Sequence, residues 1–115
     1  MEWLLLLVCS RGRTERAGVV LFDWVANQLH FKLRPTLKTS DEEIRLIWEC
    51  LPDEIRSRAE QFGAQEVANW LHTTLSNVIR VTDRQMIHAE DSAIALDALY
   101  QEHVERQDLS AEHHG

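Results

Sequence analysis

Five basic side chains flank the most strand-like part of this sequence and are its best candidates for chemistry. Three of them fall in segment 10–18, which contains Gly12 and is expected to form a turn or loop. Two more follow Leu33, where an alternating apolar pattern ends. If segments 18–25 and 28–33 pair as an antiparallel hairpin, the start of the first lies beside the end of the second. The residues expected to meet at this end of the sheet, which we call the basic cluster, are Arg11, Arg13, Arg16, Arg34 and Lys38.

The chemistry of the basic cluster is suited to anions. Guanidinium groups donate forked hydrogen bonds to phosphate and carboxylate, and free N–H groups of a glycine-containing loop add further donors. The sequence therefore predicts a surface that binds an acidic or phosphorylated partner. The same side chains could instead be solvated, or paired with acidic residues of the same chain. The sequence leaves both interpretations open.

Charge is unevenly distributed along the 115 residues, which carry 12 Lys and Arg, 19 Asp and Glu, and a net charge of −7. Residues 1–39 carry six basic and three acidic side chains, whereas residues 40–115 carry six basic and sixteen acidic ones. A surface built as a whole for nucleic acid would not be this acidic, so we do not expect nucleic acid as the main partner. The 44% hydrophobic and 27% charged fractions are typical of one globular domain.

Signatures of catalysis and of metal binding are absent from the sequence. His88-Ala89-Glu90 matches the first half of the zinc-deaminase pattern, but the P-C-x-x-C motif that supplies two thiolate ligands does not follow it. There is no H-E-x-x-H, no C-x-x-C, no G-x-S-x-G and no glycine-rich phosphate loop. We therefore expect no catalytic residue, no cofactor and no metal. The sequence favours a binding protein and leaves enzymatic activity undecided.

Apolar patterning predicts strands in both halves of the chain. A continuously apolar segment near the N-terminus is typical of a strand that is covered on both faces. Next come a β-branched, aromatic segment and an alternating one, separated by Ala26-Asn27, which predicts a hairpin with one face in water. The expected strands cover residues 3–9, 18–25, 28–33, 78–82 and 85–88.

Helical periodicity dominates the middle and the end of the chain. Ser40 and Glu43 have the spacing of a capping box, which predicts a helix start. Pro52 is expected to begin a second helix and Gly63 to end it, with a third helix following. A last helix is expected over residues 91–107.

These elements predict an α+β fold with a mainly antiparallel sheet of three to five strands, a central hairpin, and three to four helices packed on one face. Residues 1–107 are expected to form a single domain and residues 108–115 a flexible tail. The apolar start follows the acidic Glu2 and is too short to cross a membrane, so neither a signal peptide nor a membrane span is expected. Only two cysteines are present, which favours a reducing, cytoplasmic location.

One stretch of sequence carries a family resemblance. Residues 18–33 read G-V-V-L-F-D-W-V-A-N-Q-L-H-F-K-L and are preceded by Arg13, Glu15 and Arg16. This pattern resembles a bacterial domain family of unknown function, number three thousand and thirty-seven, although Arg16-Ala17 stands where members usually carry Asn and Val or Ile. The resemblance implies no reaction and no catalytic residue. The apparent placement of some members beside HipA-like kinases implies a protein partner, as in a toxin–antitoxin pair.

Three classes of function follow from these observations. The first is a small cytoplasmic, non-enzymatic protein that binds another protein or a second copy of itself. The second is an anion- or nucleotide-binding domain that uses the basic end of the sheet. The third is an accessory protein for nucleic acid.

Overall fold

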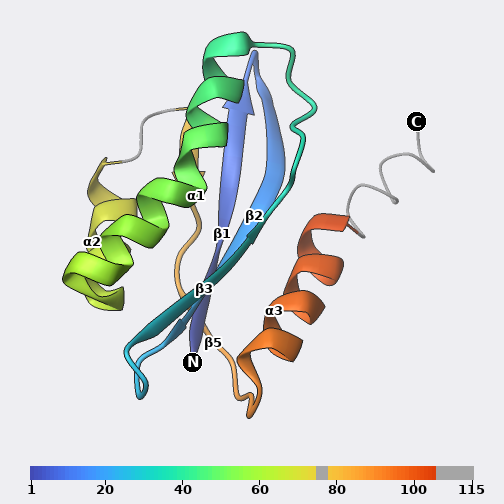
Figure 1. Ribbon diagram of the computed structural model, residues 1–115. Coiled ribbons are helices and arrows are strands. Elements are labelled where there is room, and N and C mark those ends of the chain that lie inside the picture. Colours follow the sequence, from blue (N-terminus) through green and yellow to red (C-terminus); the bar gives the residue numbers. More distant parts are fainter. Residues whose placement is uncertain (75–77, 106–115) are drawn as a thin grey trace.

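A five-stranded antiparallel sheet organises the chain and lies between two helical layers (Figure 1). The computed structural model describes residues 1–74 and 78–105. The strand order is β3-β2-β1-β4, and β5 pairs with the start of β1. The expected α+β fold is therefore confirmed. The strands are β1 (Glu2–Ser10), β2 (Arg13–Asp23), β3 (Gln28–Leu33), β4 (Ile79–Val81) and β5 (Gln85–Met86).

Helices cover both faces of the sheet, so the expected single helical layer was wrong. The first layer packs on the face that carries Leu4 and Leu6, and the second on the face that carries Trp3 and Leu5. The physical reason lies in β1, which offers an apolar surface on both faces, and each surface gains by leaving water. The first layer is α1 (Glu42–Phe62) and α2 (Ala64–Thr74), and the second is α3 (Ser92–Tyr100) with its π-helical continuation η1 (Gln101–Glu105).

The face of the β2–β3 hairpin that was expected to be wet is covered by α3. Lys32 Nζ lies 3.1 Å from Asp97 Oδ1 and 4.8 Å from the centre of the Tyr100 ring. Burial raises the pKa of the Tyr100 phenol above its usual value. A lysine can lay its apolar stem along a covered surface while its ammonium group stays hydrated, which is why polar alternation alone did not reveal the second layer.

Helix α1 begins one residue later than the capping-box pattern predicted. Its N-cap is Asp41, whose carboxylate accepts hydrogen bonds from the backbone N–H of Glu43 at 3.0 Å and of Ile44 at 3.3 Å. Ser40 therefore does not cap the helix. Asp and Ser are about equally good N-caps, so the local sequence offered two adjacent solutions that differ little in energy.

Pro52 lies inside α1 and does not begin a second helix, contrary to the sequence-based expectation. Proline in a helix interior removes a hydrogen bond and crowds the preceding turn, at a cost of about 3 kcal/mol. Trp48 and Ile55, on either side of Pro52, are both buried against the same sheet face. Their burial offsets the cost and keeps one continuous helix, which ends at Gly63 (φ 86°) as expected.

The last helix also begins as expected, with Asp91 as the N-cap of α3. Its buried Leu99 and the buried Val104 of η1 pack on Val19 and Leu21 of the sheet. Residues 106–107 of the expected helix and the expected tail, 108–115, lie outside the described residues.

The turn between β2 and β3 docks onto the junction of the two helices of the first layer. Asn27 adopts a left-handed conformation (φ 51°), as the hairpin prediction required, and its Oδ1 accepts a hydrogen bond from the N–H of Ala64 at 3.3 Å. Trp24, which the sequence could have left exposed, stacks on Phe22 and donates from Nε1 to Glu2 Oε1 at 2.9 Å. This end of the molecule is therefore fixed by side-chain contacts.

Candidate anion-binding site

The turn between β1 and β2 is tighter than expected and brings the first arginines onto a strand. Arg11 and Gly12 are the only turn residues, with φ values of 52° and 76°. Such a two-residue turn joins antiparallel strands directly. Most of segment 10–18 is therefore strand β2 and not a loop, which corrects the sequence-based expectation. Arg13 pairs across the turn with Ser10.

A β-bulge in β2 decides which side chains face which helical layer. Leu6 pairs with Gly18, but Leu7 pairs with Arg16, so Ala17 is the extra residue. A one-residue shift moves every following side chain to the other face of the sheet. After the bulge, Glu15 therefore lies on the α1 face, whereas Arg16 lies on the α3 face beside Leu7.

A cavity of about 660 Å³ opens at this end of the sheet, between the β1–β2 hairpin and the chain segment that leads to α1. Its walls combine basic side chains, hydroxyl groups and one carboxylate. One wall is tied together by the Thr39 hydroxyl, which donates to Ser10 Oγ at 3.1 Å. The lining residues include Ser10, Arg11, Arg13, Glu15, Arg16, Lys38 and Thr39.

The carboxylate in this cavity is already held by the protein. The backbone N–H of Lys38 donates to Glu15 at 3.1 Å (Oε1) and 3.0 Å (Oε2), and Arg34 Nη1 lies 3.9 Å from Oε2. The Glu15 and Arg34 side chains are each 12% exposed. Glu15 thus fixes the segment after β3 against β2, and its negative charge is compensated locally.

Arg34 is a structural residue and not part of the open surface. Its Nε donates to the backbone oxygen of Arg16 at 3.0 Å, and its Nη2 donates to that of Val104 at 3.3 Å. Arg34 therefore wraps the edge of β2 and ties η1 to the sheet. The basic cluster is divided as a result: Arg34 is paired internally, and only part of the cluster can serve a ligand.

Replacing Arg34 with alanine is expected to lower the free energy of unfolding by about 2–3 kcal/mol, because it removes the cation beside the largely buried Glu15 and the donor to two carbonyl groups. Arg34→Lys keeps the charge but cannot reproduce the fork, and should recover less than half of the loss. Urea unfolding monitored by tryptophan fluorescence measures the free energy of unfolding of both variants. A loss below about 0.5 kcal/mol for Arg34→Ala would show that these contacts contribute little to stability.

Arg11 and Arg13 are the members of the basic cluster best placed for a ligand. Both are exposed, both line the cavity, and neither forms an ion pair within residues 1–74 and 78–105. Arg13 follows the register of Glu15 and so lies on the α1 face, toward the cavity. Arg16 is exposed and also lines the cavity, but its side chain starts from the opposite face of the sheet, where Arg80 also pairs with Leu7.

Lys38 also lines the cavity and is exposed. Sequence reasoning identified the arginines and Lys38 but missed the hydroxyl groups of Ser10 and Thr39. No motif marks these two, because their proximity depends on the turn and on the path of the chain after β3. A donor set of guanidinium and hydroxyl groups suits a phosphoryl or carboxylate group.

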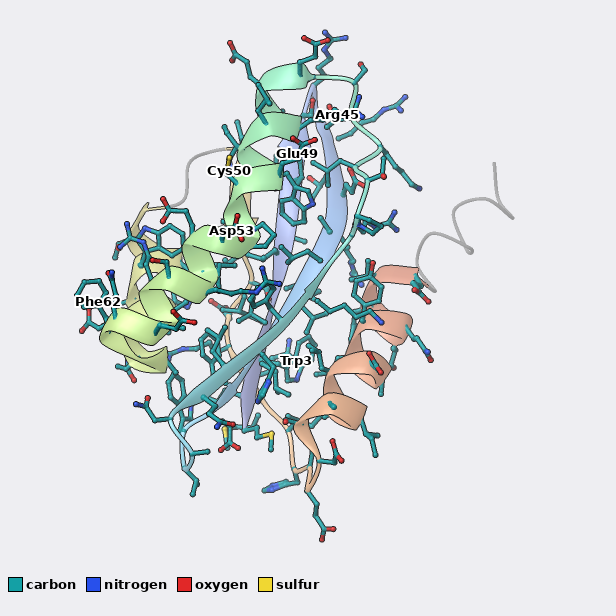
Figure 2. The ribbon with its side chains drawn as sticks, viewed as in Figure 1. Trp3, Arg45, Glu49, Cys50, Asp53 and Phe62 are labelled. Atoms are coloured by element: carbon teal, nitrogen blue, oxygen red, sulfur yellow. The ribbon has the colours of Figure 1, made fainter. Side chains whose placement is uncertain are left out.

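Among the described residues, the other reactive side chains lie apart from one another. Cys50 lies on the outer face of α1, near Glu49 and Asp53 and turned away from the sheet (Figure 2). His103 stacks on Trp3 with ring centres 4.7 Å apart, as a packed histidine does. Within the described part of the chain, no group of three His, Cys, Asp or Glu side chains is arranged to hold a metal ion.

Among residues 1–74 and 78–105, no helix has both the length and the apolar character to cross a membrane.

No protein-family model matches the chain, and neither the curated proteins nor the solved structures contain a match.

Proposed function

We propose that this protein is a non-enzymatic binding protein that holds a phosphoryl or carboxylate group of a partner protein in the cavity at the β1–β2 turn. The observation that carries the proposal is the pair Arg11 and Arg13. Both guanidinium groups are exposed beside a cavity whose one described carboxylate, Glu15, is already engaged by Arg34 and the Lys38 N–H. An incoming anion would therefore meet uncompensated positive charge.

A protein partner fits this cavity better than a nucleotide does. None of the described residues that line the cavity is aromatic, so a base would find no stacking platform there. An anionic side chain of a protein needs only the donors that are present. A HipA-like kinase in the bacterial cytoplasm, the partner that the family resemblance implies, is one candidate.

A long nucleic acid fits less well. The chain carries a net charge of −7, and Asp41, Glu42 and Glu43 lie at the start of α1, directly after the cavity-lining Ser40. A polyanion that extended beyond the cavity would meet these carboxylates and be repelled. A compact anionic group would not.

The proposal predicts selective binding of anionic peptides. We expect a fluorescent phosphoserine peptide and an Asp-rich peptide to bind, and the corresponding serine peptide and single-stranded DNA not to bind, when anisotropy is followed at physiological salt. Competition by inorganic phosphate should release the phosphopeptide. Equal binding of the serine peptide, or stronger binding of ATP or DNA than of either anionic peptide, would contradict the proposal.

A further inference from the structure

Strand β3 forms one edge of the sheet and has an unpaired side. The Arg34 N–H donates to the Ala17 oxygen at 2.7 Å, which sets the alternation of the ladder between β2 and β3. Residues two apart along β3 repeat this pattern, so His30 and Lys32 point their backbone groups toward β2. The backbone N–H and C=O groups of Leu29, Phe31 and Leu33 then point away from β2, toward the unpaired side of the strand.

These outward backbone groups have no hydrogen-bond partner within the described part of the chain. In Figure 1, β3 runs between α1 and α3, and no labelled strand lies beyond it. Three N–H and three C=O groups in a row form a template on which another strand can add.

The side chains along this edge are apolar and share one face. Leu29, Phe31 and Leu33 are half-buried against the core beneath α1. The guanidinium of Arg56, from α1, lies 5.1 Å from the centre of the Phe31 ring and leaves part of that ring uncovered. A strand added here would bury the remaining apolar surface of all three residues.

We propose that β3 is the interface through which two copies of this chain form a symmetric dimer, as an antiparallel β3–β3 pair about a twofold axis at Phe31. In this register Phe31 faces Phe31 of the partner subunit, and Leu29 faces Leu33 of the partner subunit. Every outward N–H and C=O is then paired, and the apolar residues form a continuous ladder under the two α1 helices. The proposal is independent of the anion site.

The charged residues of β3 are compatible with this register. On the opposite face, His30 lies across from Lys32 of the partner subunit, and each Lys32 is already paired with Asp97 at 3.1 Å. Arg56 is likewise paired with Asp53 at 3.5 Å. The edge therefore brings no uncompensated cation to the twofold axis. The apolar residues are symmetric about Phe31, with a leucine two positions away on either side, so the same strand in antiparallel orientation presents an identical pattern. This self-complementarity favours a second copy.

The test combines oligomeric state with amide exchange of the full chain. Sedimentation velocity from micromolar to millimolar concentration is expected to show a shift from the monomer to twice its mass. Over the same range, the amides of Leu29, Phe31 and Leu33 should become protected from exchange, whereas those of His30 and Lys32 are protected throughout. A single monomeric species, or a dimer in which these three amides stay unprotected, would overturn the proposal.

A matched pair of variants separates the backbone contribution from side-chain packing. Leu29→Pro removes an outward N–H without touching the hydrogen bonds to β2, and Leu29→Ala removes the same side chain but keeps the N–H. We expect at least a tenfold larger dimer dissociation constant for Leu29→Pro than for Leu29→Ala. Equal constants would contradict the strand pairing, and the exchange of the wild-type amides decides the matter if the proline variant does not fold.

Discussion

Replacing Trp48 with alanine is expected to lower the free energy of unfolding by about 3–5 kcal/mol, the range for removing a buried aromatic side chain. Trp48 is 4% exposed and fills the core between α1 and the sheet. Its Nε1 also donates to the backbone oxygen of Arg34 at 2.9 Å. The substitution therefore leaves a cavity and removes the indole donor to the carbonyl group where the chain leaves β3.

The matched control is Trp48→Phe, which keeps most of the ring and removes the indole N–H. Its expected cost from the lost hydrogen bond is about 1 kcal/mol, with a further contribution from the smaller ring. Because Arg34 leads into the segment that carries Lys38 and Thr39, Trp48→Ala should also weaken phosphopeptide binding. Chemical unfolding measures stability and anisotropy measures binding. A loss below about 1 kcal/mol for Trp48→Ala would contradict the packing described for α1.

Reversing the charge of Arg11 and Arg13 together is expected to weaken phosphopeptide binding by at least about 100-fold. Each charge-assisted hydrogen bond contributes about 1.5–3 kcal/mol, and loss of two such bonds corresponds to this factor or more. Both residues are exposed at the turn, so Arg11→Glu with Arg13→Glu should leave the unfolding free energy within about 0.5 kcal/mol of the wild type. Anisotropy and chemical unfolding check the two parts of the prediction.

The control for this variant lies on the opposite face of the same sheet end. Arg16 and Arg80 both pair with Leu7 and are both exposed. Arg16→Glu with Arg80→Glu changes the net charge by the same amount but keeps Arg11 and Arg13, and it replaces side chains that start from the face of the sheet opposite Arg13. We expect this variant to lose no more than about threefold in affinity, through long-range charge that salt screens. Equal losses for the two double variants would mean that overall charge, and not the cavity, determines binding.

The strands were largely predictable because their patterns are local. The continuous apolar run became β1, and the alternating residues 28–33 became β3 with the expected bounds. The second helical layer was predictable only in part, because the apolar run of β1 indicated cover on both faces whereas the pattern of β3 indicated a face in water. Lys32 reads as a solvent-facing residue, and only the packing of α3 shows that its stem and Tyr100 share a covered surface. Pro52 is a similar case, because its tolerance depends on the burial of Trp48 and Ile55 against a distant part of the chain.

The candidate site was predictable in composition but not in arrangement. The sequence placed five basic residues at one end of the sheet, and the structure separates them by role. Arg13 and Arg16 lie on opposite faces because they are three residues apart in one strand, and the bulge at Ala17 decides which face each of them takes. A small residue in a strand gives no warning of such a bulge. Arg34 is enclosed by Glu15, the Arg16 carbonyl and the Val104 carbonyl, and the Val104 contact spans 70 positions of sequence.

The separation of roles also changes the interpretation of the charge asymmetry. The basic N-terminal third is not neutralised as a whole by the acidic remainder. Glu15, one of its own three acidic residues, pairs with Arg34 and leaves Arg11 and Arg13 exposed at the cavity. The net charge of −7 therefore coexists with a small, locally positive site.

The most direct test of the anion site is an NMR titration of the guanidinium Nε–Hε signals of the isotope-labelled protein with a phosphoserine peptide. We expect saturable shifts of Arg11 and Arg13, together with the backbone amides around Thr39. The Arg34 signal should move little because its Nε–H is already bonded to the Arg16 carbonyl. Saturable shifts confined to Arg16 and Arg80, or no saturable shift at Arg11 and Arg13, would contradict the account.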